Sequence, residues 1–222
     1  AMLAMTGLCV FPHCDLFRLM ILAFDTSSAA CTAALFDGEG HCLASADELI
    51  GRGHSERLVP MLAEVLEGAR PRRILVGTGP GSFTGIRVAV AAAHGLAIGW
   101  GAEVRGFSSL ALLAAAAGTS GPVGAAVTGG HGELFVQDFD GATLEPYSAL
   151  VNAAPAEAAA AIGADLVVGS GAAALVAARG WGEAVPAWPS ARAILTLPAH
   201  LRELEPRPIY ARAPDARPRE LA

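Results

Sequence analysis

Short apolar runs separated by polar turns mark the chain from residue 20 onward. The runs 20–24, 31–36 and 41–46 follow one another closely, which predicts three antiparallel strands. Apolar residues then recur at the i, i+3, i+4, i+7 and i+8 positions of 58–66, the spacing of one helical face. A run at 73–78 predicts a buried strand, and a tight glycine loop and a helix of small residues over 84–99 follow it.

The second half of the chain repeats this pattern. Runs at 123–128 and 134–139 resemble the opening hairpin, and both hairpins end in Asp-Gly, at Asp37-Gly38 and Asp140-Gly141. The stretch 167–172 likewise resembles 75–80. An internal duplication predicts two similar α/β lobes around a cleft, over residues 20–117 and 118–222. The alternative is chance similarity between glycine-rich strand ends.

Composition agrees with a folded protein and narrows its chemistry. The 222 residues are 53% hydrophobic and 16% charged, which excludes disorder. All 15 basic residues are arginine, so the chain cannot form a lysine Schiff base or complete a Walker-type phosphate loop. Codon bias in a GC-rich genome is the simplest explanation for the missing lysine.

The net charge and the N-terminal residues indicate the partners and the cellular compartment to expect. The net charge of −6 disfavours autonomous nucleic-acid binding. Residues 1–19 are expected to be an N-terminal extension or a remnant of cloning, because they lack the basic region and the cleavage site of a signal peptide. No run reaches the eighteen or so apolar residues of a membrane helix. We therefore expect a cytoplasmic protein without membrane contact.

The turn after the first strand is the first candidate for chemistry. Two-lobed ATP-binding proteins place an acidic residue there to position a metal, and a glycine turn admits the phosphates. Here the turn is Asp25-Thr26-Ser27-Ser28, without glycine, and Thr128 stands at the matching position of the second lobe. These residues predict at most a vestigial nucleotide site. Capping of its own turn is the alternative role of Asp25.

The glycine loop 79–85 is the second candidate. It precedes a helix, so its N–H groups could bind an anion, but its spacing fits neither GxGxxG nor GxxxxGK[ST]. Thr84 is the expected N-cap, and tight packing is the alternative function of the loop. The candidate vestigial nucleotide or anion site comprises Asp25, Thr26, Ser27, Ser82 and Thr84.

The two helices of the first lobe favour an interaction surface over a catalytic site. A helical zinc pair needs histidines at i and i+4, but Leu58 follows His54, so neither a metal site nor catalytic residues are predicted. The two helices carry stripes of small or apolar residues, and such stripes allow close packing with a partner protein. The alternative is that both stripes form the core of this chain. The predicted partner interface comprises His54, Leu58, Met61, Leu62, Val65, Arg87, Ala89, Ala92, Ala93 and Leu96.

Three motifs in this order resemble the TsaB (YeaZ) family of proteins for tRNA threonylcarbamoyladenosine synthesis. They are Met20-Ile-Leu-Ala-Phe-Asp-Thr-Ser-Ser28, His54-Ser-Glu-Arg-Leu58 and Gly79-Pro-Gly-Ser-Phe-Thr-Gly-Ile-Arg87. The resemblance is strong over 20–115 and thins afterwards. The chain departs from the family in a short link before residue 73, in the turn 128–131 and in residues 1–19.

The resemblance implies a fold and a role. The fold would be that of the actin, Hsp70 and sugar-kinase (ribonuclease H-like) superfamily. The chain would be a non-catalytic partner of TsaD, which transfers threonylcarbamoyl to adenosine 37 of ANN-decoding tRNAs. TsaD would pair with helices 54–68 and 84–99, TsaE would join the complex, and the isolated chain would self-associate through the same face. ATP or ADP and metal would belong to the partners, and tRNA would meet the complex mainly through them. A small ATP-dependent kinase or ATPase, or less favourably a metallopeptidase-like protein, is the alternative.

Overall fold

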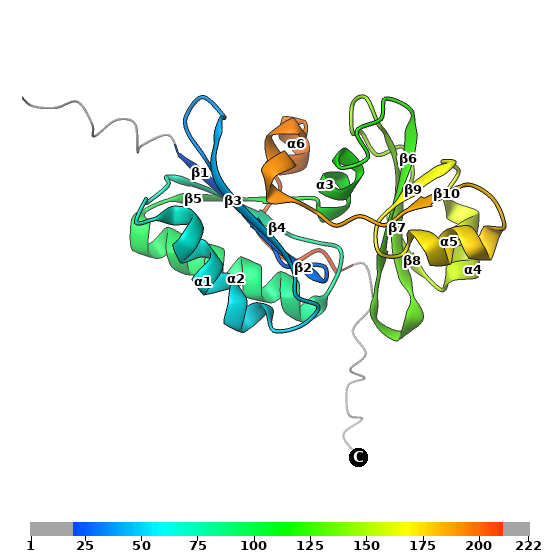
Figure 1. The fold of residues 1–222 in the computed structure, drawn as a ribbon, viewed down its shortest axis with the longest axis horizontal. Coiled ribbons are helices and arrows are strands. Elements are labelled where there is room, and N and C mark those ends of the chain that lie inside the picture. Colours follow the sequence, from blue (N-terminus) through cyan, green and yellow to red (C-terminus); the bar gives the residue numbers. More distant parts are fainter. Residues whose placement is uncertain (1–19, 211–222) are drawn as a thin grey trace, which may run out of the picture.

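Two five-stranded sheets with the same strand arrangement form the framework of the computed structural model, which describes residues 20–210 (Figure 1). The first sheet has the order β3-β2-β1-β4-β5 and the second β10-β9-β6-β7-β8. In each, an antiparallel meander of three strands is extended by two parallel strands. Read from β8, the second sheet repeats the first, which confirms the predicted pair of duplicated α/β lobes. The strands are β1 (Ile21–Asp25), β2 (Ala30–Phe36), β3 (Cys42–Leu49), β4 (Arg73–Gly77), β5 (Glu103–Phe107), β6 (Pro122–Thr128), β7 (Leu134–Asp140), β8 (Val151–Ala153), β9 (Leu166–Val168) and β10 (Glu183–Val185).

Each sheet carries a pair of helices on its outer face (Figure 1). In the first lobe, α1 (His54–Leu66) and α2 (Phe83–Trp100) pack on the sheet through a common apolar core. In the second, α4 (Pro155–Ala161) and α5 (Ala172–Arg179) do the same. The periodic apolar residues of α1 face this core, as the helical spacing predicts.

Apolar side chains fill the space between the two sheets, where the sequence predicts a cleft. This space holds α3 (Ser109–Ala115) and the short helix η3 (Ala191–Thr196), with α6 (Ala199–Arg202) beside them (Figure 1). Their side chains share one core cluster with Phe107 of the first sheet and Phe139 of the second. The inner faces of both sheets are apolar and need cover from water, so a shared core joins the lobes there.

The C-terminal part of the expected second lobe returns to the first one. The Ala191 N–H donates to Thr32 Oγ1 of β2 at 2.7 Å, and the N–H of Leu204 donates to the Gly106 carbonyl of β5 at 3.0 Å. Glu203 forms an ion pair with Arg73 of β4. Within residues 118–222, the stretch from Ala191 to Tyr210 therefore braces the first sheet. Residues 1–19 and 211–222 lie outside the described part of the chain.

One acidic side chain is buried inside the second lobe. Asp138 of β7 is 2% exposed, and its Oδ2 accepts the Gly163 N–H at 2.7 Å. Burial raises the pKa of this carboxyl above its usual value, while the N–H groups of Gly163 and Ala164 partly oppose the change. Its Oδ1 has no hydrogen-bond partner among the described residues.

Replacing Asp138 with asparagine should remove a loss of stability that the wild type undergoes as pH rises. The folded-state pKa is raised, so the folded protein binds the proton more tightly than the unfolded chain. The wild type should therefore lose stability relative to Asp138→Asn as pH rises from below about 3.8 through the pKa of the folded protein. Urea unfolding of both proteins between pH 3 and 7 measures the difference. A constant difference across that range would contradict the buried-acid interpretation.

Candidate functional site

The turn after β1 and the glycine loop before α2 lie directly against each other. Thr26 Oγ1 donates to the Gly85 carbonyl at 2.6 Å, and the Ser82 N–H donates to the Ser27 carbonyl at 2.6 Å. A Cβ at Gly81 would lie 2.1 Å from the Ser27 carbonyl oxygen, so only glycine allows this approach. The structure thus brings Asp25, Thr26, Ser27 and Ser82 of the candidate anion site together, with Thr84 exposed in the first turn of α2. Packing, the alternative function of the loop, is confirmed.

Asp25 is turned into this junction and away from solvent. It is 1% exposed, its Oδ1 accepts the Ser27 N–H at 2.5 Å, and its Oδ2 accepts the Ser109 hydroxyl at 2.5 Å. The bond to Ser27 is the turn-capping role that the sequence left open for Asp25. Both carboxylate oxygens of Asp25 therefore accept hydrogen bonds from other residues of this chain. Thr26 and Ser27 are buried as well, whereas Ser82 and Thr84 are exposed.

Replacing Asp25 with alanine should destabilise the fold by about 2–3 kcal/mol, because the Ser27 N–H and the Ser109 hydroxyl lose their acceptor inside the protein. Ser109→Ala should also destabilise the fold, by about 1–3 kcal/mol, because it removes one of the two donors to the carboxylate and the acceptor of the Gly79 N–H. Chemical denaturation measures both. An Asp25→Ala protein as stable as the wild type would show that the carboxylate does not hold the junction.

The cap of α2 differs from the expected one. The Ser82 hydroxyl accepts the Gly85 N–H at 3.2 Å, and the helix begins at Phe83, so Ser82 is the N-cap. The expectation of Thr84 in that role is wrong, because Thr84 already lies inside the first turn. Serine is as good a cap as threonine, and only the position of the first turn distinguishes them.

Most of the predicted partner interface lies in the core of the first lobe. His54, Leu58, Met61, Leu62 and Val65 of α1 are buried. Ala89 and Ala93 of α2 are buried too. For these seven residues the alternative of an intramolecular core holds. The other three have accessible surface: Arg87 is exposed, and Ala92 and Leu96 are half-buried.

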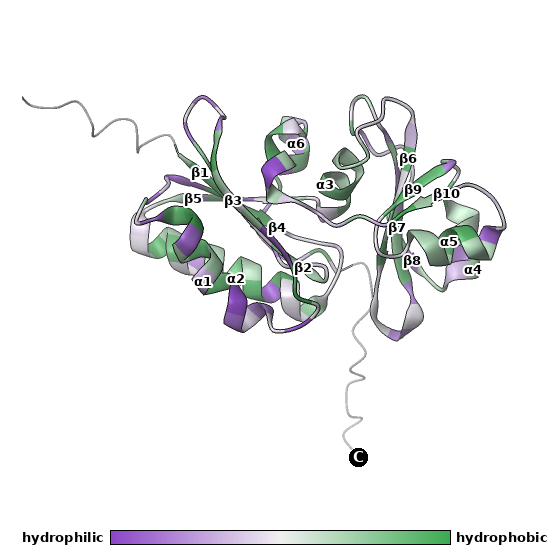
Figure 2. Ribbon diagram, viewed as in Figure 1, coloured by the Kyte–Doolittle hydropathy of each residue, from purple (hydrophilic) through white to green (hydrophobic). Residues whose placement is uncertain are grey.

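A different face of α2 is open to solvent. It carries Phe83 and Ile98, which are 53% and 87% exposed, with Arg87, Ala91 and Gly95 between them. These five residues follow one helical face, and we refer to them as the exposed α2 face. Figure 2 shows that much of α2 is hydrophobic. Sequence periodicity missed this face because α2 is apolar on nearly every side, so the stripe that faces the sheet does not stand out.

Helix α2 is also long and apolar enough, by length and composition, to cross a membrane. It contains Arg87 and His94, which interrupt the apolar run in the sequence. Ile86, Ala89, Val90 and Ala93 fix it to the first sheet through the common core. The structure therefore uses α2 as an outer helix of the lobe with a bare apolar side.

Gly95, near the C-terminal end of this face, has no packing explanation among residues 20–210. A Cβ at Gly95 would meet no atom within 4 Å, and the same holds for Gly99. Glycine inside a helix costs about 1 kcal/mol relative to alanine. The packing of the described residues therefore does not require a glycine at either position. Close approach of another backbone would require one.

Helix α1 offers one imidazole to a metal ion, that of His54. His54 is 8% exposed, and its Nε2 has no hydrogen-bond partner among the described residues. Leu58, one turn further along, is fully buried in the core and offers no ligand atom. The helix thus lacks the second ligand that a helical zinc pair needs.

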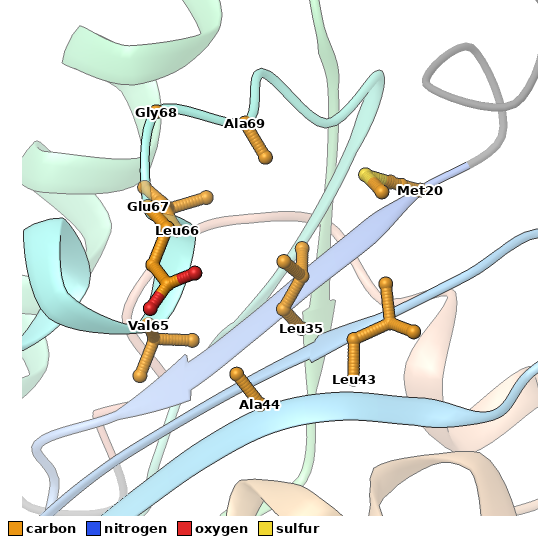
Figure 3. A pocket seen from close by; sticks show the side chains of 9 residues that line it. All are labelled: Met20, Leu35, Leu43, Ala44, Val65, Leu66, Glu67, Gly68 and Ala69. Atoms are coloured by element: carbon orange, nitrogen blue, oxygen red, sulfur yellow. The ribbon is translucent and has the colours of Figure 1, made fainter. Parts of the chain in front are cut away.

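A separate apolar hollow lies at the opposite end of β1 from Asp25 (Figure 3). It measures about 390 Å³, and among the described residues that line it only Glu67 is ionisable. Residues 20–210 place no nucleophile or acid–base pair in it, so they give no ground for a catalytic site there. Its lining residues are Met20, Leu35, Leu43, Ala44, Val65, Leu66, Glu67, Gly68 and Ala69.

Comparison with protein families and curated proteins gives consistent matches. The family model described as "TsaD: tRNA N6-adenosine threonylcarbamoyltransferase" matches residues 47–176, more than half of the chain. The tRNA threonylcarbamoyladenosine biosynthesis protein TsaB of Haemophilus influenzae is 40% identical over 106 residues, which is 45% of this chain and 44% of that protein. The protein of the same name from Escherichia coli is 37% identical over 101 residues, or 43% of each. The matched region spans less than half the length of these curated relatives.

Solved structures match over nearly the whole chain. An uncharacterized protein from Pseudomonas aeruginosa with similarity to peptidase YEAZ superposes with a TM-score of 0.73 at 31% identity, covering 87% of this chain and 99% of that one. YeaZ from Pseudomonas aeruginosa gives a TM-score of 0.72 at 29% identity, covering 86% and 100%. With the duplicated sheets, these matches confirm the α/β fold of the actin, Hsp70 and sugar-kinase (ribonuclease H-like) superfamily.

Proposed function

This chain belongs to the TsaB (YeaZ) family, and we propose that it is a partner subunit that binds and activates a TsaD-type threonylcarbamoyl transferase. The reaction forms N6-threonylcarbamoyladenosine at position 37 of ANN-decoding tRNAs. In this proposal the transferase holds the metal, and ATP or ADP is bound by partner subunits. A TsaE-type ATPase joins the complex, and the complex acts in the cytoplasm.

The exposed α2 face is the observation that carries the proposal. An exposed apolar patch on a folded protein marks an interaction site more often than a solvated surface. Gly95 permits a second helix to approach that face closely. Ile98 and Phe83 would supply most of the apolar area that the partner covers.

The hydrogen bonds of Asp25 and the lack of a second ligand beside His54 on α1 support a non-catalytic role. An ATP-dependent kinase would need the Asp25 carboxylate near a metal, but both of its oxygens are bonded inside the protein. A metallopeptidase would need a second ligand beside His54, and Leu58 supplies none.

The exposed α2 face also offers a surface for a second copy of this chain. Two copies related by a twofold axis would place the same apolar residues opposite each other, which makes the contact self-complementary. In this proposal the homodimer forms when the transferase is missing and competes with the complex for the same surface. Transferase added to the isolated chain should therefore replace dimer with heteromeric complex on gel filtration.

Reconstitution tests the proposal directly. The chain should co-purify with the TsaD-type protein of the same cell. Together with that protein, the TsaE-type protein, ATP and the threonylcarbamoyl donor, it should restore modification of an ANN-decoding tRNA. Full activity in the mixture that lacks this chain would contradict the proposal, as would failure to bind the transferase.

A further inference from the structure

Arg87 is held between two exposed aromatic rings at the start of the exposed α2 face. Its guanidinium carbon lies 3.6 Å from the centroid of the Phe83 ring and 5.8 Å from that of Tyr210. Its Nε donates to the Tyr210 hydroxyl at 3.1 Å. The two rings also contact each other, with centroids 5.3 Å apart. Three exposed side chains thus form one ordered group.

Tyr210 reaches this group because the C-terminal stretch crosses the first lobe beside α2. The Ile209 N–H donates to the Thr78 carbonyl at 2.9 Å, and His94 of α2 lies 3.2 Å from the Pro206 carbonyl oxygen through its Nε2. These bonds hold residues 206 and 209, which precede Tyr210, against the first lobe. The ring of Tyr210 is therefore positioned by the fold, although it is 52% exposed.

The terminal nitrogens of Arg87 face no carboxylate within residues 20–210. Three other arginines of the first lobe form ion pairs: Arg57 with Glu48 and Glu64, Arg73 with Glu203, and Arg105 with Glu103. Like Arg87, Arg52, Arg70 and Arg72 have no ion pair among the described residues. For Arg87, Nε is bonded to Tyr210, and the structure records no acceptor for the other two nitrogens among the described residues. An arginine fork with both terminal nitrogens available matches the two oxygens of a carboxylate.

We propose that Arg87, oriented by Phe83 and Tyr210, binds an aspartate or glutamate carboxylate of the TsaD-type partner. This inference rests on the proposed function and specifies the chemistry of the partner's surface. Arg87 lies at one end of the exposed α2 face, so a charged pair there would border an apolar centre, as in protein interfaces generally. The net charge of −6 disfavours a nucleic-acid phosphate as the ligand. Aromatic and arginine side chains are also the residue types that dominate binding energy in such interfaces.

Binding of the full-length chain to the purified TsaD-type protein tests the inference by calorimetry. Arg87→Glu should weaken binding about 30-fold or more, because the partner's carboxylate would face a like charge in a covered site. Arg87→Lys keeps the charge but loses the fork, and should weaken binding about 3- to 10-fold. Arg70→Glu makes the same charge change at another exposed position and should leave the affinity within about twofold.

Tyr210→Phe separates orientation from contact area, since it removes the bond to Nε and keeps the ring. In the otherwise wild-type chain, Tyr210→Phe should weaken binding about 2- to 5-fold. In the Arg87→Glu variant, the same change should have no further effect on binding. Wild-type affinity should fall with salt more steeply than that of Arg87→Glu. An acidic-to-arginine change on the partner that rescues Arg87→Glu would identify the carboxylate.

The outcomes separate the two proposals. A wild-type chain that does not bind the TsaD-type protein overturns the proposed function and this inference with it. A wild-type chain that binds, with Arg87→Glu binding equally well, overturns only the role of Arg87. Loss of tRNA modification with unchanged transferase binding would assign Arg87 to a phosphate instead and would also overturn the inference.

Discussion

Replacing Gly85 with alanine should lower the free energy of unfolding by about 3 kcal/mol, although the change adds one methyl group to a helix. The new Cβ would lie 1.8 Å from the Thr26 carbonyl oxygen. That oxygen belongs to the backbone of the turn after β1, so it cannot rotate away as a side chain would. Relief requires the turn and α2 to separate, which breaks the bond from Thr26 Oγ1 to the Gly85 carbonyl.

The same substitution at Gly95 supplies the matched control within the same helix. Gly95 faces open space, so alanine there should raise stability by about 0.5–1 kcal/mol through its better helix propensity. Thermal and urea unfolding of the two variants and the wild type measures the contrast. Equal effects of the two substitutions would show that the junction of turn and loop is looser than the structure describes.

Replacing Gly95 with arginine should weaken binding to the TsaD-type protein at least about 100-fold and leave the isolated chain folded. A long charged side chain on the exposed α2 face would hold an approaching helix away and would be desolvated on binding. The isolated chain should be no less stable than the wild type, since arginine favours helix more than glycine does. Calorimetry and gel filtration of the mixed proteins measure the loss of binding.

Ala177→Arg on α5 is the control for this prediction. Ala177 is exposed on the outer helix of the second lobe, so the variant carries the same new side chain away from the proposed interface. It should bind the transferase as the wild type does. If Gly95→Arg binds equally well, the partner lies on another face.

Leu62→Asp is a poor test of pairing, because Leu62 is buried in the core and its replacement would unfold the lobe.

Much of the fold follows from the chain's local patterns. The alternation of apolar runs with Asp-Gly turns predicts both hairpins, and the spacing of Leu58 to Leu66 predicts α1 and its buried side. The repetition of these patterns predicts the second lobe, which the matching sheets confirm. Each of these inferences depends on residues that are close in sequence, where hydrophobic periodicity is most informative.

The arrangement of the site depends on contacts that the sequence does not encode locally. The hydroxyl of Ser109 reaches Asp25 across 84 residues, and that bond decides that the carboxylate points inward. The choice of exposed face on α2 is set by which side meets the sheet, and a helix rich in alanine and valine gives no period to identify it. The position of Tyr210 beside Arg87 joins residues 123 apart in the chain.

The return of the last described residues to the first lobe affects how the protein is made. Ala191 hydrogen-bonds to Thr32 across 159 residues, and Glu203 bridges to Arg73 across 130. During synthesis, the first sheet emerges from the ribosome long before the segments that cover its inner face. The nascent first lobe must therefore keep apolar surface uncovered until residues 191–204 have been translated. A chain interrupted late, after both sheets are complete, would still lack the cover of the sheet made first.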